Sequence, residues 1–202
     1  MQKFPDITTL LYVINPKAND TILDLPIEVF YGPGYIVEQL GDVKYKLGPK
    51  SFFQTNTGQA IRLYDKALEF AALRPDDLVY DLYTGLGSIA LYAAKHCGRV
   101  VGVENVAPAI DDAKANASWN KIDNVDFVVG NVEDVVDTNF IEQYGIPDVI
   151  ITDPPRAGMH ATAVNTLLQM ECPKIVYISC NPATLARDVE MLSAKYRLDK
   201  LQ

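Results

Sequence analysis

Apolar runs and amphipathic segments alternate along the C-terminal three-quarters of this chain. The runs predict buried strands near residues 78–82, 99–104, 125–129, 148–152 and 174–179. Residues 57–73 carry apolar side chains at helical spacing and predict a helix before the first of these strands. Because strands that alternate with helices pair in parallel, the pattern predicts an α/β fold with a doubly wound parallel sheet. Ligands bind such sheets at the carboxyl ends of the strands.

The first fifty residues follow a different, strand-like pattern. We expect strands at residues 11–14 and 21–25 on either side of a polar turn. Residues 35–38 and 43–47 flank Gly41-Asp42 and predict a hairpin. The pattern changes near Pro49-Lys50, so the chain is divided into residues 1–50 and residues 51–202.

A glycine-rich turn follows the first strand of the predicted parallel sheet. The sequence from Asp81 to Gly87 reads Asp-Leu-Tyr-Thr-Gly-Leu-Gly, and the next strand ends in Glu104, 17 residues after Gly87. In nucleotide-binding folds such a turn lets a ligand approach the backbone, and an acid at this spacing accepts hydrogen bonds from ribose hydroxyls. The chain lacks both the Gly-x-Gly-x-x-Gly of pyrophosphate binders and a P-loop. An adenosyl cofactor without phosphate, S-adenosylmethionine (SAM), therefore fits best.

A cysteine follows the last apolar run. Cys180 lies between the strand-like residues 175–178 and Asn181-Pro182, a good N-cap and first position for a helix. The positive end of a helix dipole stabilises a thiolate, so this placement suits a nucleophile. The alternative is a small buried cysteine that closes a strand.

Four motifs occur in order along the chain. They are Ser51-Phe52-Phe53-Gln54-Thr55-Asn56, the turn from Asp81 to Gly87, Asp153-Pro154-Pro155-Arg156, and the segment from Ser179 to Asp188, which reads Ser-Cys-Asn-Pro-Ala-Thr-Leu-Ala-Arg-Asp. In these motifs the chain resembles the RNA uracil-C5 methyltransferases, the family of the enzymes that form 5-methyluridine in tRNA and 23S rRNA.

The resemblance implies a fold and an activity. Residues 51–202 would form a Rossmann-like SAM-methyltransferase domain that lacks the family's last strands, and residues 1–50 would be the remnant of a central β domain. The activity would be methylation of C5 of a uridine in RNA, with 23S rRNA as the preferred substrate. Attack of Cys180 on C6 of the base would form a covalent adduct and make C5 nucleophilic.

The resemblance also assigns residues to the cofactor. Those expected to bind SAM are Gln54, Tyr83, Gly85, Ser88, Glu104, Asn131 and Asp153. Three of them have structural alternatives, because Gln54 and Asn131 precede helices that they could cap and Asp153 could cap its own loop.

Two further residues are assigned to the RNA substrate. Phe52 would stack on a flipped base, or else pack in the core. Arg156 would pair with an RNA phosphate, or else with Asp153. His96 and His160 match no motif and are given no role.

The distribution of charge is unusual for an RNA partner. The net charge is −8, and the acidic excess lies in residues 76–202, which carry ten basic and eighteen acidic side chains. Such a surface does not attract phosphates. The resemblance offers a resolution, since full-length relatives carry an N-terminal TRAM domain for RNA, and we recognise none in this sequence.

Nothing in the sequence predicts a membrane or a metal partner. No apolar run has the length of a membrane span, and the N-terminus lacks a signal-peptide pattern. Cys97, Cys172 and Cys180 show no metal-ligand spacing, so we expect neither a metal site nor an iron–sulfur cluster. These features predict a cytoplasmic protein.

The resemblance assigns no residue of this chain as the general base. Family members carry a glutamate in a segment beyond the cysteine helix, whereas this sequence ends at Gln202 before any such motif. We therefore expect the chain alone to be inactive if that segment is absent. Two other classes stay open: an amino-methylating SAM enzyme that uses Asp153-Pro154-Pro155 and gives Cys180 no role, and a non-catalytic fragment that binds SAM or RNA.

Overall fold

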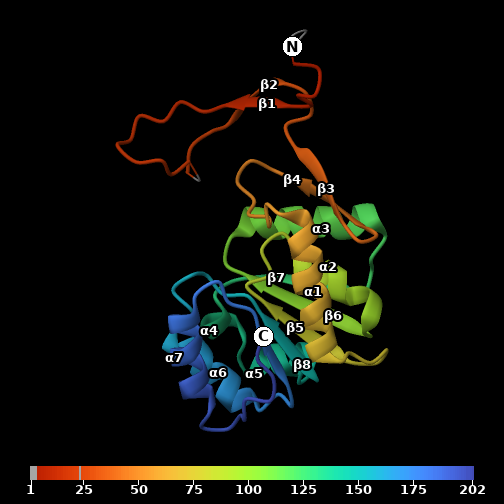
Figure 1. Ribbon diagram of the computed structural model, residues 1–202, viewed down its shortest axis with the longest axis vertical. Coiled ribbons are helices and arrows are strands. Elements are labelled where there is room, and N and C mark those ends of the chain that lie inside the picture. The colour runs from red at the N-terminus through yellow and green to blue at the C-terminus, as the bar shows by residue number, and fades with distance from the viewer. Residues whose placement is uncertain (1–3, 23) are drawn as a thin grey trace.

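The computed structural model describes residues 4–22 and 24–202, and its largest part is a three-layer α/β unit (Figure 1). A five-stranded parallel sheet forms the middle layer, in the spatial order β7-β6-β5-β8-β9. Its strands are β5 (Leu78–Leu82), β6 (Arg99–Glu104), β7 (Val125–Val129), β8 (Val149–Thr152) and β9 (Ile175–Tyr177). The chain runs outward from β5 to β7, then returns to continue on the other side of β5. The predicted doubly wound α/β fold is therefore confirmed, with a switch point beside β5.

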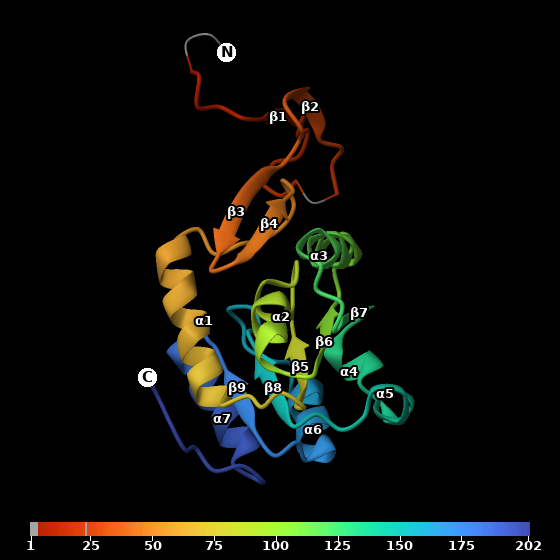
Figure 2. The same cartoon turned by 90° about the vertical axis from the view of Figure 1, so that its right-hand side faces the viewer.

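Helices cover both faces of the sheet (Figure 2). One face carries α1 (Thr57–Ala71), α2 (Ser88–Ala93) and α3 (Ala107–Asn120), with the short 3-10 helix Ala94–His96 after α2. The other carries α4 (Val132–Val135), α5 (Thr138–Tyr144), α6 (Ala161–Met170) and α7 (Pro182–Leu192). Side chains alternate along each strand, so Val79 packs in the first core and Tyr80 in the second. This alternation explains why the sheet strands read as continuous apolar runs.

The predicted hairpin near Gly41 is confirmed as β3 (Ile36–Leu40) paired antiparallel with β4 (Val43–Leu47). Its inner side chains join the core beneath α1 and α3, and they are Leu40, Val43, Tyr45 and Leu47. Two amides of α3 bond the free edge of β4: Asn116 accepts from the Lys46 N–H at 2.8 Å, and Asn120 bonds the backbone of Lys44. These bonds satisfy an edge that would otherwise be unpaired.

The strand predicted at residues 21–25 needs a correction. β1 (Leu10–Tyr12) pairs with β2 (Glu28–Tyr31) and not with residues 21–25. Thr21 donates its N–H to the side chain of Asn19 at 3.1 Å, and Asp24 pairs with Lys17. Such local side-chain bonds compete with a strand ladder. Residue 23, inside the predicted strand, lies outside the described residues.

Candidate cofactor-binding and nucleophile site

Functional groups collect where the parallel strands end. β5 ends at Asp81 and Leu82, β6 ends at Glu104, Asp153 follows β8, and Cys180 follows β9 by three residues. Because all five strands are parallel, these groups share the carboxyl edge of one sheet. The sequence-predicted site residues therefore come from segments that are far apart in the chain and adjacent in the fold.

The turn after β5 uses a backbone conformation that most residues avoid. Tyr83, Gly85 and Gly87 have φ values of 64°, 56° and 83°. A Cβ atom on Gly87 would lie 2.9 Å from the ring of Phe127 and 3.2 Å from Ala113, so glycine is required there for packing as well as conformation. Tyr83 has no such freedom, and its left-handed conformation is a strained feature of the kind that clusters at binding sites.

Glu104 is held in place by this turn. The Gly85 N–H donates to one carboxylate oxygen at 3.1 Å, and the Val106 N–H donates to the other at 2.9 Å. An ionised carboxylate has about four acceptor positions, so two stay free for a ligand. The acid found by its spacing is thus fixed against the glycine turn and can still accept hydroxyl groups.

The buried Asp81 and the half-buried Asp153 lie in the same region. Burial raises the pKa of Asp81 to about 7, and the nearby charges of Asp153 and Glu104 add to this effect. Burial also raises the pKa of Asp153 to about 6. Thr84 donates its hydroxyl to Asp81 at 2.5 Å, whereas Oδ1 of Asp81 has no hydrogen-bond partner among the described residues. Burial disfavours the charged form of each acid. A positive charge close to them would therefore stabilise both carboxylates.

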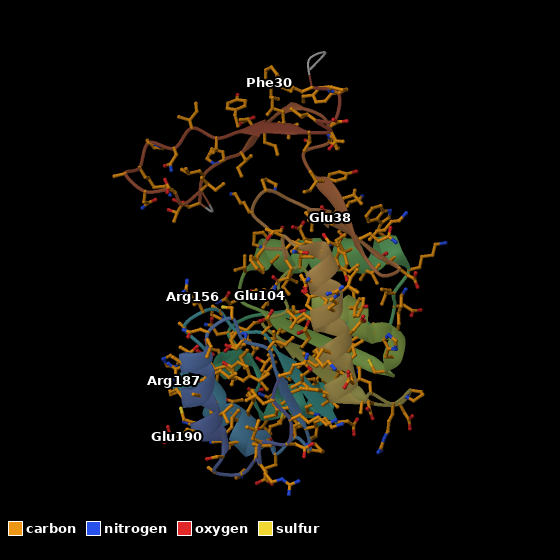
Figure 3. All side chains as sticks on the ribbon, viewed as in Figure 1. Phe30, Glu38, Glu104, Arg156, Arg187 and Glu190 are labelled. Atoms are coloured by element: carbon orange, nitrogen blue, oxygen red, sulfur yellow. The ribbon has the colours of Figure 1, made fainter. Side chains whose placement is uncertain are left out.

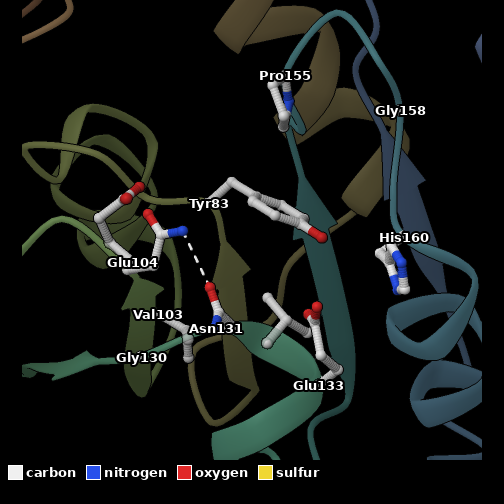
Figure 4. A pocket seen from close by; sticks show the side chains of 11 residues that line it. Tyr83, Val103, Glu104, Gly130, Asn131, Glu133, Pro155, Gly158 and His160 are labelled. Carbon is white, nitrogen blue, oxygen red and sulfur yellow. Dashed lines mark hydrogen bonds between the residues drawn. The ribbon is translucent and has the colours of Figure 1, made fainter.

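A cavity of about 150 Å³ opens beside Glu104 (Figure 4). It is lined by Tyr83, Val103, Glu104, Asn105, Gly130, Asn131, Val132, Glu133, Pro155, Gly158 and His160. The ring of Tyr83 lies across it, between Glu104 on one side and His160 on the other (Figure 4). Three residues predicted to bind SAM thus meet here: Tyr83, Glu104 and Asn131.

Asn131 has the backbone position of an N-cap but makes no capping bond to α4. Its side chain instead accepts from Asn105 at 3.0 Å and donates to Asp134 at 2.7 Å. The capping alternative is therefore wrong in this structure. His160, which matches no motif, lines the cavity; only the fold reveals this, because His160 comes from the loop after β8.

Gln54 lies apart from this cavity. It lines a second space of about 430 Å³, beside β3 and the segment before α1. The helix cap of α1 is Asn56, which accepts from the Gln59 N–H at 3.1 Å, so Gln54 does not cap the helix. Four other predicted cofactor or nucleophile residues line neither space, namely Gly85, Ser88, Asp153 and Cys180. The hydroxyl of Ser88 lies 3.1 Å from that of Tyr64.

The two residues assigned to RNA are both exposed. Phe52 is 76% exposed, which rules out its alternative role in the core. Arg156 is exposed in the loop after β8 (Figure 3), and among residues 4–22 and 24–202 no ion pair joins it to Asp153. Both side chains are free to contact a large ligand.

Cys180 is exposed, whereas Cys97 and Cys172 are buried. The predicted cap beside it is confirmed, because Asn181 accepts from the Ala183 N–H at 3.1 Å and Pro182 opens α7. Ser179 closes this turn by donating its hydroxyl to the Asn181 carbonyl at 3.0 Å. The alternative of a buried, strand-closing cysteine is therefore wrong, and Cys180 is exposed one residue before the N-cap of α7.

Two kinds of site are not found in the part of the chain that the structure describes. No three histidine, cysteine, aspartate or glutamate side chains lie together in a way that could bind a metal ion. Of the described helices, none combines the length and the apolar character needed to cross a bilayer.

The sheet order and the acidic and glycine groups at its carboxyl edge define a nucleotide-cofactor-binding α/β protein. Comparison with known proteins narrows this class. The chain belongs to the tRNA (uracil-5-)-methyltransferase family, whose sequence model matches residues 34–202.

Relatives and a solved structure agree with this assignment. An uncharacterized RNA methyltransferase of Bacteroides thetaiotaomicron is 52% identical over 199 residues, covering 98% of this chain and 44% of the relative. One of Porphyromonas gingivalis is 51% identical, covering 98% of this chain and 43% of the relative. The Pyrococcus abyssi tRNA (uracil-54, C5)-methyltransferase, solved with S-adenosyl-L-homocysteine, superimposes with a TM-score of 0.79 at 36% identity, over 95% of this chain and 46% of that one. This chain thus spans less than half the length of these proteins.

Proposed function

We propose that this chain is the catalytic part of a SAM-dependent RNA methyltransferase that methylates C5 of a uridine. The observation that carries the proposal is the position of Cys180, the exposed cysteine, directly after β9 and next to the strand end that bears Asp153. Family membership, and S-adenosyl-L-homocysteine in the Pyrococcus structure, support the choice of cofactor.

The cofactor would lie along the carboxyl edge of the sheet. The cavity beside Glu104 is smaller than the roughly 300–1,000 Å³ of a typical ligand pocket, so it would take only part of the molecule, the ribose and adenine. Glu104 would accept the ribose hydroxyls, and Asn131 would meet the adenine edge. The cationic end of SAM would then extend past Gly85 and Ser88 toward Asp81 and Asp153.

Gln54 lines the larger space, so its side chain would have to extend to the carboxyl edge of the sheet to contact the cofactor. The larger space itself is away from the strand ends, where sheets of this kind bind their ligands, so we do not assign the adenosyl group to it.

The chemistry requires a nucleophile because uracil C5 does not attack a methyl sulfonium unaided. The Cys180 thiolate would add to C6, and the electron pair of the C5–C6 bond would become an enolate. C5 would then take the methyl group from SAM, leaving S-adenosylhomocysteine. Removal of the C5 proton by a base and expulsion of the thiolate would restore the ring. We assign no residue to that base.

The RNA would approach over Phe52 and Arg156. A base must leave its stack to reach such a site, and an exposed aromatic ring can stack on it. We keep 23S rRNA as the predicted substrate, with tRNA as the competitor because the Pyrococcus protein acts on tRNA. Methylation of transcripts of both RNAs, compared at equal concentration, would decide between them.

Cofactor binding tests the first half of the proposal. We expect calorimetry to show that Glu104→Ala weakens SAM binding by about tenfold or more, because a charged acceptor of hydrogen bonds is lost. Asp111→Ala, at an exposed acid of α3 that does not line the cavity, is the control and is expected to retain the affinity of the unmodified chain. Equal affinities of the Glu104→Ala and unmodified proteins would contradict the placement of the cofactor.

A further inference from the structure

The loop between β8 and α6 belongs to both halves of the site. It starts at Asp153, and three of its residues line the cavity beside Glu104, namely Pro155, Gly158 and His160. The same loop lies against α7, the helix that begins just after Cys180. It is therefore the one described segment that contacts the cavity and is also bonded to the nucleophile's helix.

Side chains of α7 and its cap hold the backbone of this loop. Asn181 donates its amide to the Arg156 carbonyl at 3.1 Å, and Thr184 donates its hydroxyl to the same oxygen at 3.3 Å. Arg187 donates from one guanidinium nitrogen to the carbonyls of Ala157 and Met159, each at 3.0 Å. Residues 181, 184 and 187, spaced about one helical turn apart, thus bond the backbone of three loop residues, Arg156, Ala157 and Met159.

A fully buried carboxylate anchors the arrangement. Asp188 accepts from the Met159 N–H at 2.8 Å and from the Tyr177 hydroxyl at 2.6 Å, and it pairs with the Arg187 guanidinium at 2.6 Å. Burial and this bond raise the pKa of Tyr177, which keeps its hydroxyl as a donor. β9, α7 and the loop therefore meet at one buried charge whose hydrogen-bond partners are all in place.

Gly158 shows how closely the loop approaches the helix. Its φ is +77°, and a Cβ atom there would lie 2.6 Å from the Arg187 guanidinium and 2.6 Å from the Asp188 carboxylate. If a cofactor in the cavity shifts the loop, the loop must therefore push against Arg187. Packed contacts of this kind transmit displacement because they cannot be compressed.

We propose that Arg187 is a positioning residue that couples occupancy of the cofactor cavity to the placement of Cys180. This inference rests on the proposed cofactor site, but it concerns a residue that contacts neither cofactor nor RNA in that proposal. The guanidinium fork reaches two loop carbonyls and Asp188 at once, which a lysine cannot do. Binding of the cofactor would thereby fix the thiol before RNA arrives.

The test follows the reactivity of the thiol, so it does not depend on methyl transfer. Cys180 is the exposed cysteine, so iodoacetamide should label it ahead of the buried Cys97 and Cys172, and the labelled peptide is quantified by mass spectrometry. We expect saturating S-adenosylhomocysteine to change the labelling rate of Cys180 by about fivefold or more, the usual size of such coupling. Arg187→Lys keeps a cation beside Asp188 and should reduce the change to less than about twofold, with cofactor affinity within about threefold of the original.

Two further variants separate coupling from damage to the fold. Thr184→Val removes one bond to the loop at constant size and should reduce the ligand effect partially. Arg99→Lys makes the same change in an arginine that pairs with Asp126 at the opposite, amino edge of the sheet, and it should leave the full effect. Equal thermal unfolding of Arg187→Lys and Arg99→Lys would show that stability does not explain the difference.

Three outcomes would overturn the inference. A ligand effect that survives in Arg187→Lys would mean that the ligand shields the thiol directly, and it would overturn the inference. Ligand binding without any change in labelling of the unmodified chain would also overturn it, while leaving the proposed cofactor site intact. Absence of binding to the unmodified chain would refute the proposed cofactor site, and the inference with it.

Discussion

At the scale of single residues, the chemistry of this site depends on how the fold raises the pKa of two aspartates. Asp153 and Asp81 are separated by 72 positions in the sequence, yet the half-buried Asp153 and the buried Asp81 lie at the ends of the neighbouring strands β8 and β5. The sequence could indicate that each acid ends an apolar run. It could not indicate that burial raises the pKa of each carboxyl, because burial depends on what the neighbouring strands and helices place around them.

The raised pKa of Asp153 predicts a pH-dependent cofactor affinity. SAM is a cation, so the carboxylate form binds it, and that form is lost as the pH falls through about 6. We expect affinity to rise about tenfold between pH 5 and pH 7, in proportion to the ionised fraction. Calorimetry at several pH values measures this dependence.

Two variants define what would count against this prediction. Asp153→Asn should bind weakly with a shallower pH profile, because Asp81 alone still titrates beside the cation, whereas Asp111→Asn, an exposed acid of α3, should retain the slope. An unchanged slope in Asp153→Asn would assign the titration to another group.

At the scale of elements, the sequence predicted most of the fold because its signals were local. Five apolar runs and the Asn181-Pro182 start of α7 correspond to observed elements. The wrong strand at residues 21–25 shows the limit, since β-pairing is decided by distant partners. Likewise Asn131 and His160 line one cavity because of the order of the strands in the sheet, which the sequence does not reveal. The division at residue 50 stays a prediction, although β3 and β4 share a core with α1 and α3.

The glycine turn gives a prediction at this scale. Gly87→Ala would force a methyl group to 2.9 Å from Phe127 in a left-handed conformation, so we expect a loss of about 2 kcal/mol in the free energy of unfolding. Gly58→Ala, within α1 and with only an ordinary contact at 3.8 Å, should be neutral or stabilising by about 0.5–1 kcal/mol. Urea denaturation of both variants measures the difference, and equal stabilities would show that the turn tolerates a side chain.

At the scale of the whole molecule, the net negative charge does not suit the RNA substrate that we propose. The acidic excess lies in residues 76–202, which also carry most of the site that we assign to RNA, and no local motif resolves this conflict. The chain spans less than half the length of its relatives, so other parts of such proteins are available to supply affinity for RNA.

We therefore expect these 202 residues alone to bind RNA weakly, with a shallow dependence on salt. Fluorescence anisotropy with a labelled transcript, titrated at several salt concentrations, measures both quantities. Tight binding with a steep salt slope would reveal phosphate contacts that the charge distribution does not suggest.

The central claim is that Cys180 forms a covalent bond with the uracil ring. RNA that contains 5-fluorouridine tests it most directly, because fluorine at C5 cannot leave as a proton and the adduct accumulates whichever group is the base. With SAM present, we predict a protein–RNA adduct on a denaturing gel, with the crosslink mapped by mass spectrometry to the peptide of Cys180. Cys180→Ala should abolish it, and Cys97→Ala and Cys172→Ala should not. An adduct that persists in Cys180→Ala, or methyl transfer to RNA by that variant, would contradict the account.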